Sequence, residues 1–298
     1  MSTWRLRVVL KGDGKRPDVN HAIQQVVPLV REHADLIAVS IDNAFDLKNP
    51  DYDLLINFGG DGSLLGVARA MGEQQRPVVG VNFGKIGFLA SFELADLLVS
   101  LNRLLDPNRH NGFPRRSMIM LEACVRRQNG DEEHFLALND AVISRGEVSR
   151  LCTLECRIDG DYVTHYAADG LIVKTPAGTT AHSLSAGGPL VEPELNALVL
   201  TPICAHTLAV RPLVIPGQRR VELRVEESHT SIGATFDGQN YTPMKPGDVL
   251  SVQLFPHQFT VLGVNSQGFY ATLRSKLGWG GQLNRSRDSQ RRRAILDD

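Results

Sequence analysis

The sequence has no long hydrophobic run, no excess of charge of one sign and no closely paired cysteines. No stretch approaches the ~18 uncharged apolar residues that a membrane-spanning helix needs, and no signal-peptide apolar block follows Met1. We therefore expect a cytoplasmic protein with no membrane partner. The 32 Lys and Arg residues nearly balance the 33 Asp and Glu residues, so charge gives no reason to expect a nucleic-acid partner.

The four cysteines contain no C-x-x-C pair. The even spacing of Cys152 and Cys156 places both on one face of a predicted strand. A zinc site needs tighter pairs together with matching His or Cys ligands. We therefore expect reduced cysteines in the core and no fixed metal site in the protein.

The length of 298 residues suggests two domains. Up to about residue 105, short apolar runs alternate with helical patterns, an order that favours a parallel sheet wrapped by helices. Pro28 is expected to end or kink the first helix. The predicted strands are residues 5–10, 35–41, 53–58 and 77–82, and the predicted helices are residues 19–33, 63–71 and 93–105.

After Pro107 the pattern changes to many short strands separated by Gly, Pro and Asn, which is typical of an all-β domain. The predicted fold class is therefore α/β plus β. An α/β domain over residues 1–110 is followed by a β-rich, sandwich-like domain over residues 111–265. A helix within residues 266–283 is expected to return to the first domain, and residues 284–298 form an Arg-rich tail.

A glycine-rich motif, GGDGS at residues 59–63, follows a nearly continuous apolar strand and leads into a helix. Glycines let the backbone approach a ligand closely, and the helix N-terminus offers free N–H groups to phosphate. Asp61 would disfavour anion binding alone, so it predicts a proton acceptor or a magnesium contact beside the phosphates. The alternative is an Asp-Gly turn that only caps the helix.

Three familiar motifs are missing. The Walker pattern G-x-x-x-x-G-K-[ST] does not occur. A partial G-x-G-x-x-G begins at Gly12, but Pro17 stands where its third glycine should be. His182 has serines nearby, but the G-x-S-x-G motif of serine hydrolases is absent. These absences disfavour a P-loop, a dinucleotide fingerprint and hydrolysis.

Three further segments join apolar strands to polar or glycine-rich loops. NFGKIGFL at residues 82–89 follows a second buried strand, at the end where open parallel sheets bind ligands. Asn139 and Asp140 interrupt a strand-like run, where they either cap a bend or accept hydrogen bonds from a ligand hydroxyl. Residues 169–189 (DGLIVKTPAGTTAHSLSAGGP) lead into a loop of small hydroxylated residues and glycines that suits sugar or phosphate.

The sequence resembles the NAD kinase family in five segments that occur in the same order: GGDGS, NFGKIGFL, LNDAVISRG, DGLIVKTPAGTTAHSLSAGGP and TPICAHTLAVRP. GGDG is shared with lipid kinases and phosphofructokinases, whereas the TPAGTTA and TPICAHTL segments single out NAD kinases. The resemblance runs from about Leu54 to Trp279. It implies a Rossmann-like N-terminal domain and phosphorylation of the adenosine-ribose 2′-hydroxyl of NAD to give NADP.

The resemblance also implies site residues. Asp61 is the expected general base, Asn139 and Asp140 are expected to hold the ribose and adenine of NAD, and Asp169 is expected near the nicotinamide end. Gly60 and Gly62 would leave room for phosphate. The full set expected to bind substrate or nucleotide is Gly60, Gly62, Ser63, Phe88, Asn139, Asp140, Asp169, Ala177, Thr180, Ala181, His182, Ser185, Cys204 and His206.

Three positions depart from the family pattern. Asp140 stands where the family usually has Glu, so its ribose contact is expected to be longer or bridged by water. His182 stands where the family usually has Tyr, which leaves less apolar area for stacking. Lys174 stands where a small residue is expected, and we expect it to face away from the site.

The resemblance implies ATP or polyphosphate as phosphoryl donor, magnesium that arrives with the nucleotide, and NAD as acceptor. A cation such as Lys85 would help to neutralise the γ-phosphate. The resemblance further implies a homodimer or homotetramer, with Cys204 and His206 near the place where the partner subunit approaches. Two alternatives stay open: a lipid or sugar kinase that uses GGDG, and a non-catalytic NAD(P)-binding sensor.

Overall fold

The computed structural model describes residues 5–42, 44–84, 87–90, 92–106, 112–146, 152–207, 209–228, 231–263 and 269–277. The chain divides into two compact units: unit 1 is Met1–Arg116 with Thr260–Asp298, and unit 2 is Ser117–Phe259. The Pro- and Asn-rich stretch that suggested a boundary at residue 110 is followed by a strand that still belongs to the sheet of unit 1. The Arg-rich tail predicted at residues 284–298 lies outside the described residues.

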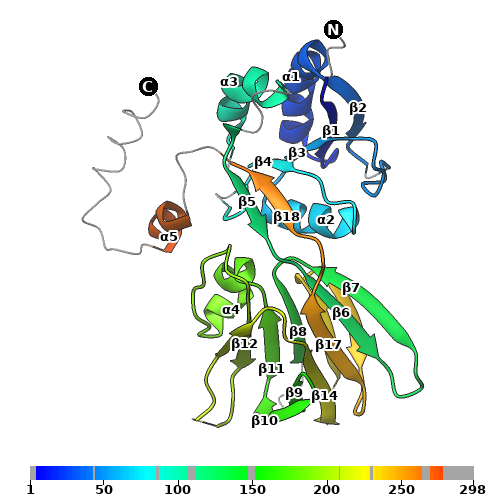
Figure 1. Cartoon of the computed structure of the whole chain (residues 1–298), viewed down its shortest axis with the longest axis vertical. Helices are drawn as coiled ribbons and strands as arrows, with labels where there is room; N and C mark the ends of the chain where they lie inside the picture. The colour runs from blue at the N-terminus through cyan, green and yellow to red at the C-terminus, as the bar shows by residue number, and fades with distance from the viewer. Residues whose placement is uncertain are drawn as a thin grey trace. The chain divides into compact units, whose positions relative to one another are not determined.

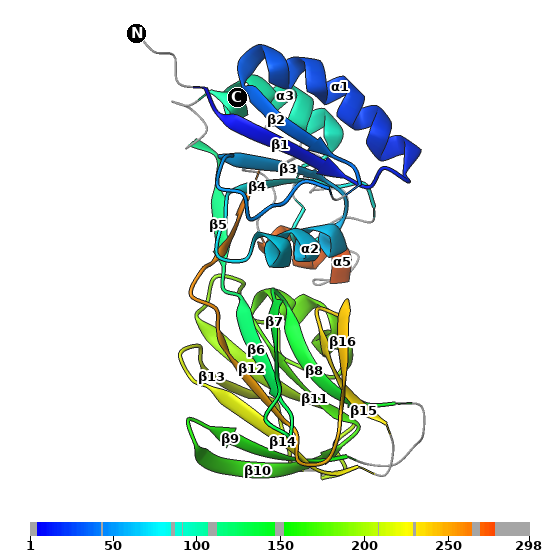
Figure 2. The same cartoon turned by 90° about the vertical axis from the view of Figure 1, so that its right-hand side faces the viewer.

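Unit 1 is built on a sheet with the strand order β2-β1-β3-β4-β18-β5, in which neighbours from β2 to β18 are parallel. Helices α1 and α3 cover one face of this sheet, and α2 lies on the other (Figure 2). Every residue of β3 and β4 is buried, as their apolar runs predict. The elements are β1 Arg7–Gly12, α1 Pro17–His33, β2 Asp35–Ser40, β3 Leu54–Phe58, α2 Asp61–Met71, β4 Val78–Val81, α3 Leu94–Leu105, β5 Arg115–Met118, β18 Phe259–Leu262 and α5 Phe269–Leu277.

The sequence predicts that Pro28 ends or kinks helix α1; the helix continues through it, so the first of these two outcomes is wrong. Proline removes the hydrogen bond to the carbonyl four residues earlier, that of Gln24. Both Pro28 and Gln24 are exposed, so water can bond this carbonyl. The opposite face of the helix stays packed in the core through Val19, Ala22, Ile23, Val26 and Val30.

Unit 2 is a sandwich of two antiparallel sheets, with strand orders β10-β9-β14-β17-β6-β7 and β13-β12-β11-β8-β15-β16 (Figure 1). Alternate residues of both sheets form one apolar core between them. The predicted fold class is therefore confirmed. The elements are β6 Leu121–Arg126, β7 Glu132–Ala137, β8 Asp140–Arg145, β9 Cys152–Ile158, β10 Asp161–Ala168, β11 Gly170–Lys174, η2 Ala177–Thr180, α4 His182–Ser185, β12 Ala197–Ile203, β13 Leu213–Pro216, β14 Val221–Ser228, β15 Ile232–Phe236, β16 Asn240–Met244 and β17 Val249–Leu254.

The four cysteines are all free thiols. Cys152 and Cys156 lie in the core of unit 2, as their spacing predicts, and burial raises the pKa of Cys156 to about 12. Cys124 is half-buried and Cys204 is exposed, so the prediction of a core position is wrong for these two. Among the described residues, no helix is both long enough and apolar enough to cross a membrane.

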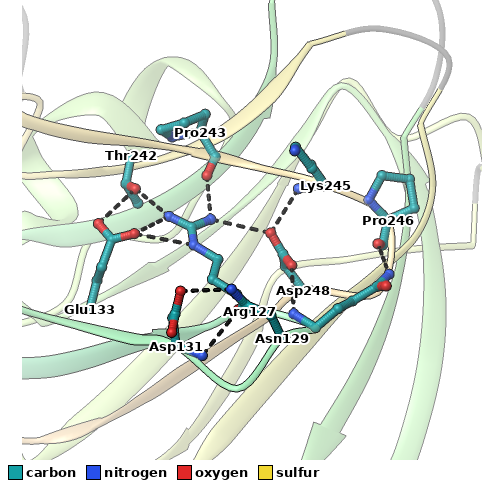
Figure 3. A network of polar contacts seen from close by, with 10 residues as sticks. Arg127, Asn129, Asp131, Glu133, Thr242, Pro243, Lys245, Pro246 and Asp248 are labelled. Carbon is teal, nitrogen blue, oxygen red and sulfur yellow. Dashed lines mark hydrogen bonds and ion pairs between the residues drawn. The ribbon is translucent and has the colours of Figure 1, made fainter.

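A polar network joins the β6–β7 turn to the β16–β17 turn (Figure 3). The guanidinium of Arg127 contacts the carboxylates of Glu133 and Asp248, the hydroxyl of Thr242 and the carbonyl of Pro243. The hydroxyl of Thr242 also donates to Glu133 at 2.9 Å. One guanidinium therefore links two turns that are far apart in the sequence.

Replacing Arg127 with methionine is expected to lower the free energy of unfolding by about 3 kcal/mol, because it leaves a buried charge without its partner. The Asp248 side chain is only 5% exposed, and it accepts hydrogen bonds from the backbone N–H groups of Gln128 and Lys245. Urea unfolding of the full chain would measure the loss. Arg157→Met, which removes a more exposed ion pair on the same sandwich, should change stability by less than about 1 kcal/mol. Equal losses in the two variants would contradict this account.

Candidate functional site

Asp61 is the first residue of α2, directly after the buried strand β3. Its carboxylate accepts three backbone hydrogen bonds from the loop that follows β4. Phe88 N donates to Oδ2 at 2.6 Å, while Leu89 N and Ala90 N donate to Oδ1 at 3.1 and 3.2 Å. The hydrogen bonds of the Asp61 carboxylate therefore hold the GGDGS and NFGKIGFL motifs together.

Gly87 is required by this contact. A Cβ at Gly87 would lie 1.8 Å from Oδ1 of Asp61, so the loop or the carboxylate would have to move to admit it. The glycine lets the backbone of the loop pass directly over the carboxylate. The structure does not support the capping alternative for Asp61, because its carboxylate bonds the loop after β4 and no side-chain hydrogen bond from the described residues caps α2. These contacts leave room for a chemical role, since a carboxylate can accept more than three hydrogen bonds.

The other residues of the GGDGS motif differ in their surroundings. Gly60 is the N-cap of α2, and a Cβ there would meet none of the described atoms within 4 Å, so the space above Gly60 is open in this part of the structure. Gly62 is exposed in the first turn. The Ser63 hydroxyl instead turns inward and donates to Oδ1 of the buried Asn57 at 3.0 Å.

Phe88 is half-buried, and its ring faces the C-terminal helix α5. The ammonium of Lys276 lies 4.2 Å from the ring centroid, within the range of a cation–π contact. Burial lowers the pKa of Lys276, while the charge of Asp61 opposes this shift. The sequence reasoning missed Lys276 and named Lys85, which lies outside the described residues. The only signal was a basic residue at helical spacing in a segment expected to return to the first domain.

In unit 2, the outer face of one sheet carries several predicted residues. Ala141 and Val173 point into the core, so their neighbours Asp140 and Lys174 point to the opposite face. Asp140 and Lys174 are directly opposite each other in the β8–β11 pairing. Thr201 lies on the same face of the adjoining strand β12.

Asn139 and Asp140 are positioned by a second carboxylate, Asp237. Its oxygens accept hydrogen bonds from the backbone N–H groups of Leu138, Asn139 and Asp140 at 3.1, 2.7 and 3.3 Å. Burial and the charge of Asp237 raise the pKa of Asp140 to about 7, although the charge of Lys174 opposes this shift. Asp140 can therefore change its charge near neutral pH.

Residues 175–191 cover this face of the sheet. Ala177 is buried in η2, Thr180 is half-buried, and Ala181 and Ser185 are exposed. The backbone of Gly178 packs on that of Asn139, where a Cβ would lie 2.3 Å from the carbonyl oxygen. His182 begins α4, but its side chain lies outside the described part of the structure. The loop and the Asn139–Asp140 pair therefore form one group.

Asp169 lies at the other end of β11. Its carboxylate pairs with Nε and Nη2 of Arg145 at 2.7 and 2.9 Å, which lowers the pKa of Asp169. Cys204 and His206 are both exposed. A hydrogen bond with the Cys204 side chain and the charge of His206 lower the pKa of Asp169 further. Sequence reasoning quoted Arg145 inside a motif but gave it no role.

Most of the predicted residues thus fall into three groups. Gly60, Asp61, Gly62, Ser63 and Phe88 belong to unit 1. The other two groups belong to unit 2, at the two ends of β11, which are separated by about 14 Å at the usual rise of a strand. One contains Asn139, Asp140, Ala177 and Thr180, and the other contains Asp169, Cys204 and His206.

Two groups of His, Cys and carboxylate side chains are close enough to hold a metal ion among the described residues, but neither includes a predicted site residue. One is Cys124, Glu132 and His134, and the other is Glu155, His165 and Glu226; most of these side chains are exposed. Asp61 belongs to neither group. The expectation that the metal arrives with the nucleotide therefore stays a prediction.

Comparison with known proteins decides the family. Residues 39–109 match the ATP-NAD kinase N-terminal domain, and residues 138–263 match the ATP-NAD kinase C-terminal domain. The chain is 39% identical to the NAD kinase of Rhodopirellula baltica over 277 residues, which cover 93% of this chain and 88% of that protein. The chain belongs to the NAD kinase family. The NAD kinase of Heliobacterium modesticaldum is 41% identical over 76% of this chain and 79% of its own length.

Solved NAD kinase structures share the fold. Yeast NADH kinase, solved in complex with NADH, matches with a TM-score of 0.81 at 23% identity, over 93% of this chain and 89% of its own. An NAD kinase from Archaeoglobus fulgidus, solved in complex with ATP, matches with a TM-score of 0.69 at 22% identity, over 92% of this chain and 98% of its own. Together with the family match and the curated relatives above, this confirms the resemblance to NAD kinases, and the chain is an enzyme that phosphorylates NAD.

Proposed function

We propose that this NAD kinase transfers the γ-phosphoryl group of ATP to the 2′-hydroxyl of the adenosine ribose of NAD, and that Asp61 is the general base. The observation that carries the role of Asp61 is its place at the start of α2, beside the open space above Gly60. Free N–H groups at this helix end favour phosphate. A carboxylate there is suited to take the proton of the attacking hydroxyl.

The hydrogen bonds of Asp61 indicate which oxygen reacts. A carboxylate offers about four lone-pair sites, two on each oxygen. Among the described residues, Oδ1 accepts two backbone N–H groups and Oδ2 accepts one, so the site that remains is on Oδ2. We infer that Oδ2 accepts the proton of the ribose hydroxyl, while the backbone bonds fix the orientation of the carboxylate.

The residues of unit 2 suit a dinucleotide because they form two groups at opposite ends of β11. Asn139 and Asp140 would contact the adenosine ribose at one end, beside Ala177 and Thr180. Asp169 would lie near the nicotinamide end, held in place by Arg145. An extended ligand with two different ends can reach both groups, whereas a single sugar cannot.

Phosphoryl transfer depends mainly on positioning and on neutralising the charge of the phosphates. Magnesium bound with the nucleotide would supply part of this positive charge. Lys276 is a second candidate source, because its ammonium lies near Asp61 and is partly desolvated. A cation in a partly dry environment stabilises developing negative charge more strongly than one in water. Polyphosphate as an alternative donor, a homodimer or homotetramer, and a cytoplasmic location stay predictions.

A coupled assay tests the proposal. Purified protein with magnesium, ATP and NAD is expected to form NADP, detected with an NADP-specific dehydrogenase. Parallel reactions replace ATP with polyphosphate, or NAD with diacylglycerol. NAD binding without NADP formation from either donor would favour a non-catalytic sensor. Phosphorylation of the lipid without NAD binding would overturn the proposal.

A further inference from the structure

Lys174 is a buried charged side chain that the proposed mechanism does not use. It is fully buried at the end of β11, although a lone ammonium is costly to remove from water. The sequence suggested that Lys174 faces away from the site, and this is not the case. Its side chain instead lies between the sheet and the covering segment 175–191. A charge kept in such a place needs compensating contacts.

The first contact joins Lys174 to the covering segment. The ammonium donates a hydrogen bond to the hydroxyl of Ser183, which is itself buried in α4. Gly188 lies against the same ammonium, since a Cβ there would be 2.6 Å from Nζ and 2.9 Å from the Thr201 hydroxyl. Gly188 N also donates to Ser183 O at 2.9 Å. Lys174 thus fastens the middle of the segment to the sheet.

The second contact is electrostatic. Burial lowers the pKa of Lys174 to about 8, and the negative charge of Asp140 opposes this shift. At Asp140, the negative charge of Asp237 raises the pKa and the positive charge of Lys174 lowers it. Among the described residues no ion pair within 4.0 Å joins Lys174 to Asp140, and none donates a hydrogen bond to the Asp140 carboxylate. Lys174 therefore favours the charged form of Asp140 without occupying its oxygens.

We propose that Lys174 is a positioning residue for NAD: its charge opposes that of Asp237 at Asp140, and its hydrogen bond to Ser183 holds the covering segment in place. The inference rests on the proposed ribose contact of Asp140. An ionised carboxylate accepts hydrogen bonds from ribose hydroxyls with both oxygens, whereas a protonated one loses part of this capacity. A neutral side chain at position 174 should therefore weaken NAD binding most strongly near neutral pH.

Lys174→Met tests the charge. We expect the KM for NAD at pH 7 to rise about fivefold, because a larger share of Asp140 becomes protonated, with a smaller change in kcat. The loss of NAD binding on acidification should begin at a higher pH than in the wild type. Above about pH 8 the two proteins should converge, because wild-type Lys174 then loses its own proton. Lys174→Gln keeps a hydrogen-bond donor for Ser183 and should show the same pH shift. It replaces Lys174→Met in the test if the methionine variant does not fold.

Two further variants separate the parts of the inference. Ser183→Ala removes the hydrogen bond but keeps the charge, so it should raise the KM at every pH without moving the pH profile. Asp140→Asn should weaken NAD binding and abolish the pH shift caused by Lys174→Met. Thermal unfolding of each variant, compared with the wild type, shows whether the sandwich remains folded.

The outcomes distinguish the inference from the proposed function. If Asp140→Asn weakens NAD binding while neither change at Lys174 alters the KM or its pH profile, the inference alone is wrong. If Asp140→Asn leaves NAD binding unchanged, the proposed role of Asp140 fails and the inference fails with it. If Lys174→Met still shifts the pH profile when it is combined with Asp140→Asn, the inference is also wrong.

Discussion

Replacing Asp61 with asparagine is expected to lower kcat about a thousandfold while the affinity for NAD changes little. Asparagine is nearly isosteric, but its amide cannot take the proton of the attacking hydroxyl. NADP formation measured by the coupled assay gives kcat, and equilibrium binding of NAD gives the affinity. Turnover near the wild-type rate would show that Asp61 is not the general base.

The backbone bonds of Asp61 require a control for the order of the loop. In Asp61→Asn, the amide nitrogen can face the N–H of Phe88, so the loop loses contacts as well as a base. Gly87→Ala moves the loop away from the carboxylate but keeps the base. We expect this variant to lower kcat only about tenfold. Equal losses of activity and of thermal stability in both variants would instead assign Asp61 a purely structural role.

Lys276→Met is expected to lower kcat about a hundredfold, because it removes a desolvated positive charge near Asp61. Methionine keeps most of the apolar contact with the Phe88 ring, so α5 should remain packed. Steady-state kinetics with ATP and NAD as varied substrates would measure the effect. The expected change is mainly in kcat, since the charge matters most when the phosphoryl group moves.

Arg274→Met provides the matched control for Lys276. Arg274 is an exposed residue of the same helix, so its loss changes the net charge of α5 equally. We expect this variant to keep the wild-type kcat. If both variants lose the same activity, the total charge or the packing of α5 matters, and the specific role of Lys276 is excluded.

Much of the fold follows from local pattern. The apolar runs at β3 and β4 predict buried parallel strands, because a strand that helices cover on both faces is apolar on both faces. Strands such as β7 lack such a pattern, because the first half of its sequence, EEHFLA, is exposed and polar. Their strand conformation is imposed by pairing with β6 rather than by their own residues.

The site was less accessible to sequence reasoning. The motifs identify Asp61 and Asp140, but not the three backbone donors that orient Asp61 or the Asp237 carboxylate beneath Asp140. Both contacts join residues far apart in the chain. Lys174 was expected to face away from the site, because no local pattern shows that a segment covers its strand. Such contacts depend on tertiary packing, which a single sequence does not display.

The place of unit 2 in the chain has a consequence for folding. The chain leaves unit 1 after β5 and returns at β18, and these two strands are neighbours in one sheet. Within unit 2, Phe255 N bonds Met120 O at 2.9 Å, so the ends of the inserted segment are already held together. Closing a long disordered loop would cost chain entropy. Prior folding of the sandwich removes this cost, so we expect the sandwich to fold first and then to template the last strands of the other unit.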